Sequence, residues 1–278
     1  MKRTTGRTEF EARRLIVQKK SDTGITFVQQ MEKVLAKAHD PFTPFPQQTL
    51  DRMYDEFWST AESQDYMSGR AFTDETLQYF RIGYSAKQSL VTVPMHDHKG
   101  NPIGVIGRSI VDKRFKNSPG LPTSKTLWNM HRAKQCGETV IITEASFDAM
   151  RVHQAGYPNV VACLGGNFSP HHLDMLDRTF NNIVIMTDFD KKDKHMYIGC
   201  RKCAKEGLAL CKGHNPGRDL GEKIADQLGR KRVLWASYEQ FMVYPHDAKD
   251  AGDMTDNEIR QSLRSAVPNF EYRAWDVY

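Results

Sequence analysis

Carboxylates follow successive apolar runs in the second half of this 278-residue chain, at points where β-strands are expected to end. Clustered carboxylates repel one another, so a fold keeps them together mainly where a cation neutralises the group. Oxygen ligands of this kind suit Mg²⁺, which retains waters and bridges to substrate phosphates. The pattern therefore indicates metal-dependent phosphoryl-transfer chemistry. The acidic residues concerned are Glu144, Asp148, Asp188, Asp190, Asp250 and Asp253.

The elements that must position these carboxylates alternate between strand and helix. We expect strands over 139–143, 160–164, 182–187 and 232–236, and helices over 146–154, 169–176 and 218–228. Continuous apolar strands that alternate with amphipathic helices predict a parallel sheet covered on both faces. Functional groups gather at the carboxyl edge of such a sheet. Asp148 is expected in the first turn of its helix, near Glu144, and Asp188 and Asp190 are expected to point to one side.

The first half of the chain predicts a different arrangement. Two apolar segments, 90–95 and 103–106, flank the turn-rich sequence DHKGN, which is typical of a β-hairpin. The segment 71–84 reads as a helix with Thr73 as its N-cap. Residues 42–47, FTPFPQ, read as a linker because of their two prolines. An antiparallel sheet is thus expected ahead of the parallel one.

Basic residues concentrate in this first half. The chain has 39 Lys and Arg against 34 Asp and Glu, for a formal charge of +5, and the segment 108–134 holds seven Lys or Arg with Asp112 as its one acid. A solvent-exposed face is one interpretation of such a run. Phe115 and Trp128 are interleaved with these basic residues, and this favours a surface that binds a polyanion, although Trp128 itself is expected in the core.

Four possible zinc ligands lie in a polar segment after Asp190. The sequence CRKCAKEGLALCKGH contains Cys200, Cys203, Cys211 and His214, two ligand pairs that could close a tetrahedral structural Zn²⁺ site. The alternative is a chance cluster of reduced thiols. Cys136 and Cys163 lie outside this spacing and are expected to be buried thiols.

The chain shows no apolar run long enough to cross a bilayer, and its N-terminus lacks the apolar stretch of a signal peptide. We therefore expect no membrane partner and a cytoplasmic protein, in a bacterial or phage-infected cell.

Several motifs, in a fixed order, resemble a known family. The runs VIITEASFDAM, LGG, IVIMTDFD and PHDAKDAGDM resemble the TOPRIM domain shared by bacterial-type DNA primases, topoisomerases and some nucleases. The upstream runs GRAFTDETLQYFRIGY, VTVPMHDHKGNPIGVIGRS and KRFKNSPGLPTSKTLWNMHRAK resemble the basic N-terminal subdomain of bacterial and phage primase cores. The resemblance covers about residues 68–265.

The resemblance implies roles for particular residues. Glu144 would act as general base or metal organiser, Asp188 and Asp190 would bind the catalytic metals, Mg²⁺ or Mn²⁺, and the other three acids would complete the cluster. The family positions that contact template or nucleotide phosphates correspond to Arg108, Arg114, Lys116, Asn117 and Lys125. Two departures stand out. Ala145 replaces the family's glycine after Glu144, and an insertion separates Asp190 from Gly217.

These observations predict an α/β protein with a basic mixed α+β N-terminal subdomain and a TOPRIM parallel-sheet domain. The predicted divisions are an arm and linker over 1–45, the template-binding subdomain over 46–136, the TOPRIM domain over 137–265 with its insertion at 191–216, and a tail over 266–278.

The predicted function is that of a DNA primase, which synthesises short RNA primers on single-stranded DNA from ribonucleoside triphosphates. No cysteine precedes Cys136 and no Walker A sequence is present. The resemblance is thus to a compact phage-like core that works with a replicative helicase and a separate zinc-binding module.

Two other functions stay open at this point. A TOPRIM nuclease needs similar carboxylates and metals but hydrolyses DNA, and a non-catalytic accessory protein would use the fold only to bind single strands. A topoisomerase fits least, because those enzymes carry further domains with a nucleophilic tyrosine.

Overall fold

The computed structural model describes residues 42–165, 168–189, 215–238 and 243–274. The chain divides into two compact units, 1–43 and 44–278, and nearly all described residues belong to the second. Asp190 and the four predicted zinc ligands, Cys200, Cys203, Cys211 and His214, lie outside the described residues.

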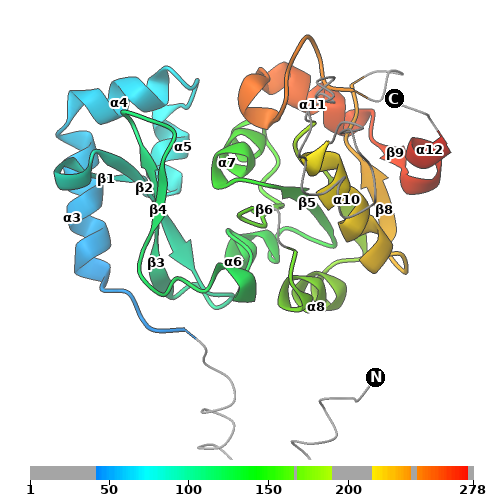
Figure 1. Ribbon diagram of the computed structural model, residues 1–278, viewed down its shortest axis with the longest axis horizontal. Coiled ribbons are helices and arrows are strands. Elements are labelled where there is room, and N and C mark those ends of the chain that lie inside the picture. Colours follow the sequence, from blue (N-terminus) through cyan, green and yellow to red (C-terminus); the bar gives the residue numbers. More distant parts are fainter. Residues whose placement is uncertain (1–41, 166–167, 190–214, 239–242, 275–278) are drawn as a thin grey trace, which may run out of the picture. The chain divides into compact units, whose positions relative to one another are not determined.

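Three helices open the second unit, as Figure 1 shows in blue and cyan. They are α3 (Gln47–Trp58), α4 (Ala61–Ser68) and α5 (Asp74–Tyr79). Thr73 caps α5 as predicted, because its hydroxyl accepts a hydrogen bond from the backbone N–H of Thr76. The predicted helix over 71–84 was too long. Arg81 takes a left-handed backbone (φ 51°), which ends the helical path and leads into strand β1 (Gly83–Ser85).

The predicted hairpin forms the centre of an antiparallel sheet, here called the hairpin sheet, with strand order β1-β2-β3-β4. Its turn is held by the carboxylate of Asp97, which accepts hydrogen bonds from the backbone N–H groups of Lys99 (2.8 Å) and Asn101 (2.9 Å). Gly100 supplies the positive φ (95°) that the turn needs. The remaining strands are β2 (Leu90–His96), β3 (Pro102–Ser109) and β4 (Phe115–Asn117).

A second sheet of five strands, here called the parallel sheet, has the order β6-β5-β7-β8-β9. Its first four strands run parallel, and the short β9 pairs antiparallel with β8 at one edge. The α/β fold class is confirmed, with this antiparallel edge strand as a detail that the sequence did not predict. The strands are β5 (Thr139–Thr143), β6 (Val160–Ala162), β7 (Asn182–Ile185), β8 (Arg232–Trp235) and β9 (Val267–Pro268).

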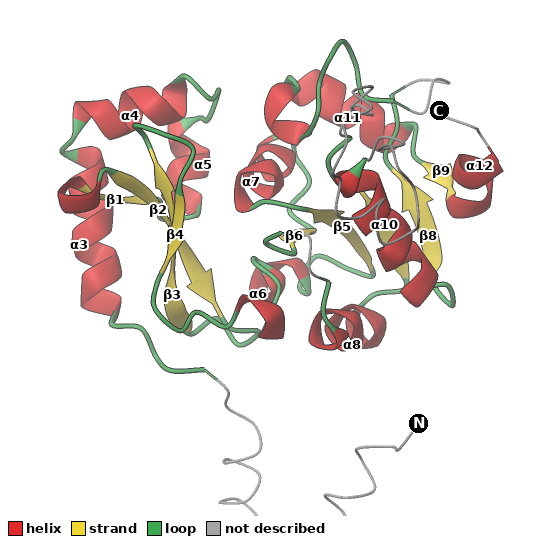
Figure 2. Cartoon of the chain, viewed as in Figure 1, coloured by secondary structure: helices red, strands yellow, loops and turns green. Residues whose placement is uncertain are grey.

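Helices surround the parallel sheet (Figure 2). Leu176 and Ile224, from two of these helices, lie in the same buried cluster as Ile183 and Ile185 of β7. Buried apolar surface of this kind is the main stabilising term of such a layer. The helices are α6 (Met130–Ala133), α7 (Ser146–Gln154), α8 (Pro170–Thr179), α10 (Pro216–Gln227), α11 (Asp256–Arg264) and α12 (Asn269–Ala274), with the 3₁₀ turns η2 (Thr123–Lys125) and η4 (Ala251–Asp253). A further 3₁₀ turn, η1 (Ala86–Gln88), connects β1 and β2 of the hairpin sheet.

Trp128 joins the two sheets. Its backbone N–H donates to the carbonyl of Ala162 (2.9 Å) in β6, and its indole N–H donates to the carbonyl of Pro94 (3.0 Å) in β2. Its side chain is buried, as the sequence predicted. One residue is therefore hydrogen-bonded to both sheets, to one through its backbone and to the other through its side chain.

The two cysteines outside the insertion differ in exposure. Cys163 is buried as expected, whereas the expectation for Cys136 was wrong, because Cys136 lies in the exposed stretch between α6 and β5.

Among the helices of the described ranges, none combines the length and the apolar character needed to span a membrane.

A substitution at Gly221 of α10 can test how tightly this helix packs on the parallel sheet. A Cβ at this position would lie 2.6 Å from the ring of Trp235 and 2.9 Å from Thr187 Oγ1. We expect Gly221→Ala to lower the free energy of unfolding, because overpacking costs about 1–3 kcal/mol and exceeds the gain in helix propensity of about 1 kcal/mol. Urea denaturation measures the change. Gly229→Ala is the control, since its Cβ would meet nothing closer than 3.5 Å. Equal stability of the two variants would contradict the packing argument.

A second prediction concerns pH. The rings of His96 and His131 lie 4.7 Å apart, and burial, followed by the charge of Arg132, lowers their pKa values to about 4 and about 3. Because both are lowered from 6.5, the folded protein binds these protons more weakly than the unfolded chain. The two neutral histidines therefore contribute fully to the free energy of unfolding above pH 6.5, and this contribution declines as the pH falls toward 4.

We expect His131→Gln to reduce the drop in melting temperature between pH 7.5 and pH 5, relative to the unchanged chain. Scanning calorimetry at both pH values measures this drop. His171→Gln removes an exposed histidine instead and should leave the pH dependence unchanged. An equal drop in His131→Gln and in the unchanged chain would refute the assignment.

Candidate active site

The structure brings the described acidic residues to one edge of the parallel sheet. Glu144 follows β5, Asp148 lies in the first turn of α7, and Asp188 follows β7. Four carboxylates line one cavity of about 480 Å³, and two line an adjoining cavity of about 280 Å³. The larger cavity is lined by Asp148, Asp188, Asp250 and Asp253, and the smaller one by Glu144 and Asp188.

Asp148 is the most buried of these carboxylates, at 6% exposed. Burial, and then the negative charges of Asp250 and Asp188, raise the pKa of this carboxyl well above its usual value. Its Oδ2 accepts a hydrogen bond from the backbone N–H of Ala145 (3.3 Å), which closes the start of α7. Ala145 has an ordinary extended backbone (φ −109°, ψ 157°), so the turn does not require the glycine that the family has here.

Asp250 and Asp253 lie on the loop that contains η4. The Asp253 backbone N–H donates to Asp250 Oδ1 (3.2 Å), so Asp250 caps this turn. Burial and the charge of Asp253 raise the pKa of Asp250. A Cβ on Gly252 would lie 2.9 Å from Asp250 Oδ1 and 3.3 Å from Asp148 Oδ1. Carboxylates from two distant segments therefore converge on the same point.

Asp188 is fixed by the segments on either side of it. Its Oδ2 lies 3.5 Å from Nζ of Lys249, and the next residue, Phe189, donates its N–H to the carbonyl of Lys249 (2.6 Å). On the other side, a Cβ on Gly217 would overlap the carbonyl oxygen of Asp188. Glycine at 217 thus allows the start of α10 to lie directly against the Asp188 backbone.

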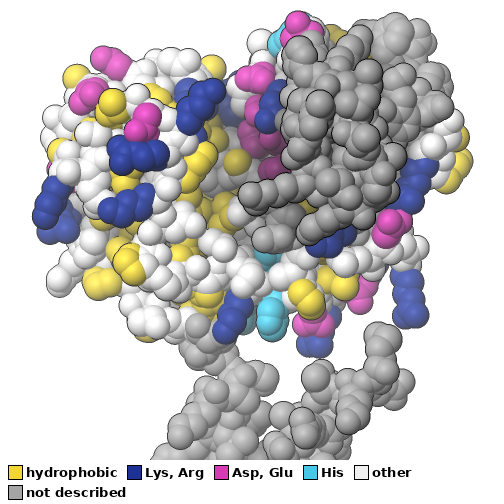
Figure 3. Space-filling view, viewed as in Figure 1, with side chains coloured by type: hydrophobic (Ala, Val, Ile, Leu, Met, Phe, Trp, Pro, Cys, Tyr) yellow, Lys and Arg dark blue, Asp and Glu magenta, His cyan; other side chains and the backbone are white. Residues whose placement is uncertain are grey.

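The opposite wall of the larger cavity is basic, with Arg70, Arg108 and Lys113 among its lining residues. The Arg108 guanidinium lies 4.3 Å from the centre of the exposed Phe115 ring, and that of Arg70 lies 5.2 Å from the centre of the Tyr66 ring. Figure 3 shows dark blue and magenta side chains on either side of a recess. One cavity therefore joins cations from the hairpin-sheet side to carboxylates of the parallel-sheet side.

Strand alternation explains which of the predicted phosphate-contacting residues of β3 and β4 reach the two cavities. Arg108 of β3 pairs with Phe115 of β4, and Ile106 pairs with Asn117. Arg108 lines the larger cavity and Asn117 the smaller one. Lys116 has the opposite parity in β4, and its Nζ donates to Gln88 Oε1 (2.7 Å). The structure does not bring Lys116 to either cavity.

Two further predicted phosphate contacts also lie elsewhere. Arg114 is 74% exposed and pairs with Asp112 at 2.6 Å. Lys125 is exposed in η2. Neither side chain lines the described cavities. Phosphate binding by Arg114, Lys116 and Lys125 stays a prediction.

Sequence reasoning missed four cations that line the larger cavity, Arg70, Lys113, Arg151 and Lys249. Three of them lie inside runs that carry the family resemblance, and Arg151 directly follows such a run. Those runs were the available signal, but in a single sequence nothing indicated which of their basic side chains faces the carboxylates.

The carboxylates fit a hydrated magnesium ion. Within the described part of the chain, no group of three or more His, Cys, Asp or Glu side chains is arranged to hold a metal. Mg²⁺, however, typically uses only one or two protein carboxylates together with waters and substrate phosphates. The raised pKa values of Asp148 and Asp250 show a local excess of negative charge that a cation would relieve.

Comparison with known proteins supports this description. A family model for the Toprim domain matches residues 138–206. A DNA primase of Thermotoga maritima is 23% identical over 226 residues, covering 60% of this chain and 40% of that protein. A DNA primase of Clostridium acetobutylicum is 33% identical over 139 residues, covering 45% of this chain and 23% of that protein. The chain thus spans less than half the length of these relatives.

Solved structures show the same fold. A crystal structure of the Aquifex aeolicus primase, with its zinc-binding and RNA polymerase domains, has a TM-score of 0.60 at 18% identity, covering 89% of this chain and 69% of that chain. The RNA polymerase domain of the Mycobacterium tuberculosis primase DnaG also has a TM-score of 0.60, at 17% identity, covering 82% of this chain and 84% of that chain.

The site and fold define a protein with a Toprim domain beside a basic antiparallel sheet. The chain has the fold of the DnaG-type primase core, and part of it is similar in sequence to bacterial DNA primases. The family resemblance read from the sequence is confirmed. The predicted domain boundaries stay predictions.

Asp148→Asn tests the charge balance of the site. We expect the melting temperature of the magnesium-free protein to rise, because the substitution removes one of several repelling carboxylates from a buried position. Millimolar Mg²⁺ should then raise the melting temperature of this variant by less than it raises that of the unchanged chain, since a ligand stabilises a protein only to the extent that it binds the folded state. Thermal unfolding with and without Mg²⁺ measures both effects. Asp174→Asn, which changes an exposed carboxylate on α8, should alter neither. An unchanged magnesium response in Asp148→Asn would contradict the assignment.

Proposed function

We propose that this chain synthesises short RNA primers on single-stranded DNA by metal-dependent nucleotidyl transfer. Primer synthesis requires a template strand, a nucleoside triphosphate and divalent cations within one crevice. The observation that carries the proposal is the larger cavity, because basic side chains of one subdomain and carboxylates of the other line it together. The homology to bacterial DNA primases supports the same activity.

Asp188 and Asp148 would hold Mg²⁺ at the carboxyl edge of the parallel sheet, with Asp190 and Asp250 as further ligands. Bound there, the metal would offset the charge that develops as a 3′-hydroxyl attacks the α-phosphate. Glu144 would organise the metals or accept the proton of that hydroxyl. Asp253 would act indirectly, since its backbone N–H and carboxylate fix Asp250 and Lys249.

Arg70, Arg108 and Lys113 would hold phosphates of the template or the nucleotide on the opposite wall. The exposed Phe115 ring, with Arg108 against one face, offers a surface on which a base can stack. Asn117 in the adjoining cavity would contact the same ligand by hydrogen bonds. These contacts are mainly electrostatic, so binding should weaken as salt rises.

Single-stranded DNA and ribonucleoside triphosphates are the proposed substrates. A published structure of the DnaG primase catalytic domain bound to single-stranded DNA shares this fold, with a TM-score of 0.58 at 16% identity. A replicative helicase and a separate zinc-binding module as partners, a structural zinc ion in the insertion, and a phage origin stay predictions from the sequence.

The decisive test supplies single-stranded DNA, Mg²⁺ and four ribonucleotides, one of them labelled, and measures short RNA products. We expect primers from the unchanged chain and a loss of at least about 100-fold in Asp188→Ala, because the substitution removes charge stabilisation at the reacting phosphate. Asp174→Ala, which changes an exposed carboxylate on α8, is the matched control and should retain full activity.

Labelled DNA in the same reaction separates the alternatives. Metal-dependent cleavage of the DNA without RNA synthesis would replace the proposal with a nuclease. Undiminished RNA synthesis by Asp188→Ala would overturn the assignment of the site.

A further inference from the structure

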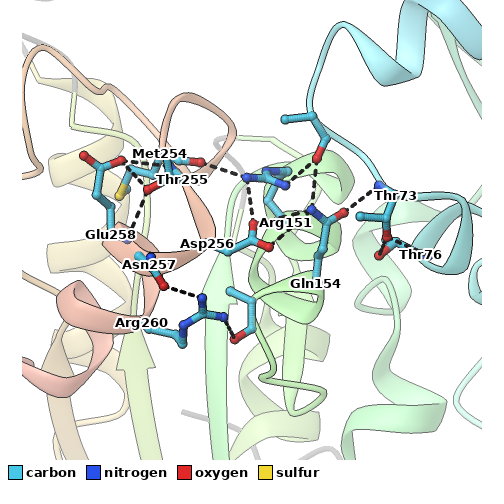
Figure 4. A network of polar contacts seen from close by, with 12 residues as sticks. Thr73, Thr76, Arg151, Gln154, Met254, Thr255, Asp256, Asn257, Glu258 and Arg260 are labelled. Carbon is cyan, nitrogen blue, oxygen red and sulfur yellow. Dashed lines mark hydrogen bonds and ion pairs between the residues drawn. The ribbon is translucent and has the colours of Figure 1, made fainter.

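Arg151 of α7 is a buried cation at the junction of three segments (Figure 4). Its side chain is 3% exposed, and its guanidinium donates to the carbonyl of Ala71 (2.6 Å) and the carbonyl of Met254 (2.9 Å) and forms an ion pair with Asp256 (2.8 Å). A planar guanidinium can make such divergent contacts, which a single ammonium group cannot reproduce. Arg151 thus connects α7 to residues 80 and 103 positions away.

The first of these contacts fixes the segment before α5. Ala71 has a left-handed backbone (φ 59°), and its carbonyl accepts a second hydrogen bond from Gln154 Nε2 (2.9 Å). Gln154 Oε1 in turn accepts from the backbone N–H of Thr73 (3.0 Å). One turn of α7 therefore fixes both ends of the segment that holds Phe72.

Arg70 directly precedes this fixed segment and lines the larger cavity. Its guanidinium lies 5.7 Å from the centre of the Phe147 ring, on the same helix as Arg151. The Phe72 ring meets that of Phe147 edge to face, with centres 5.5 Å apart. The direction of Arg70 toward the carboxylates thus depends on how residues 71–73 are held against α7.

The other contacts of Arg151 fix the acidic side. Met254 follows η4, the turn that Asp250 caps, and Asp256 begins α11. A single buried side chain therefore connects the segment beside Arg70 with the segment beside Asp250, and both to the helix that carries Asp148.

We propose that Arg151 is a positioning residue that acts through Arg70: it holds residues 71–73 against α7, so that the Arg70 guanidinium faces the carboxylate site and binds a phosphate of single-stranded DNA there. The assignment of the phosphate as substrate rests on the proposed function. Arg151 also lines the larger cavity, but its side chain is 3% exposed and both terminal nitrogens of its guanidinium are engaged by Ala71, Met254 and Asp256, so we assign it the positioning role and Arg70 the contact with the phosphate.

Single-stranded DNA binding tests this directly, without the need for catalysis. Fluorescence anisotropy of a labelled oligonucleotide should show about tenfold weaker binding for Arg151→Met and a smaller loss for Arg151→Lys, which keeps the charge for Asp256. The slope of log affinity against log salt should become shallower by about 0.7, the value for one lost phosphate contact on a single strand. Arg178→Met, which removes an exposed arginine of α8, is the control and should bind as the unchanged chain does.

A double-mutant cycle separates positioning from a general loss of structure. If Arg151 acts through Arg70, Arg151→Lys should weaken binding little further in an Arg70→Ala background. In primer synthesis Arg151→Met should raise KM for the template about tenfold and Arg151→Lys should raise it less, with kcat changed less than about threefold in both, because Asp148 and Asp188 keep their own anchors. Circular dichroism confirms folding, and Arg151→Lys carries the test should Arg151→Met not fold.

Unchanged DNA binding in both Arg151 variants, or losses that simply add to that of Arg70→Ala, would overturn the proposal. The proposed function has a separate point of failure. If the unchanged chain makes no RNA while the binding cycle behaves as expected, the positioning role stands and the primase activity does not.

Discussion

Repulsion between carboxylates is the constraint around which this fold is organised. Asp148 is buried beside Asp188 and Asp250, and each of these negative charges makes the ionisation of Asp148 less favourable. No single segment could hold them together, since they follow β5, β7 and β8 along the chain. The parallel sheet brings the ends of these segments to one edge, and its buried apolar core provides the free energy that keeps them there.

Positive charge at this edge comes from two directions. Lys249 approaches Asp188 from the same loop as Asp250, whereas Arg70 and Arg108 approach from the hairpin sheet and its helices. The cavity can therefore attract a polyanion on one wall and a divalent cation on the other. Phosphoryl-transfer chemistry needs both, because the substrate carries negative charge that only cations can offset. Because cations come from the hairpin-sheet side and most of the carboxylates from the parallel-sheet side, the placement of the two sheets sets how these charges face each other across the cavity.

Much of this arrangement follows from local pattern. The alternation of apolar runs with helices predicts the parallel sheet, the DHKGN turn predicts the hairpin, and the order of acidic motifs predicts the site edge. These features depend on residues close in sequence, where periodicity and turn chemistry act. Helix ends were less predictable. The chain leaves α5 at Tyr79 because of the backbone at Arg81 and the nearby packing of β1 on α3, which the apolar residues at 80 and 82 do not reveal.

The sequence by itself determined the fold class, the family and the carboxylates at the ends of β5 and β7. Tertiary structure decided which basic residues face those carboxylates. The Lys116 side chain points away from the cavity, because alternate residues of β4 face opposite sides of the sheet. Arg70, which no local sequence pattern distinguishes, lines the cavity. The hydrogen bonds from Arg151 to the carbonyls of Ala71 and Met254 could not be predicted from the sequence either, since these two residues lie 80 and 103 positions from Arg151 in the chain. Side-chain direction at a junction depends on such long-range contacts, whereas strands and helices depend mainly on their neighbours in the chain.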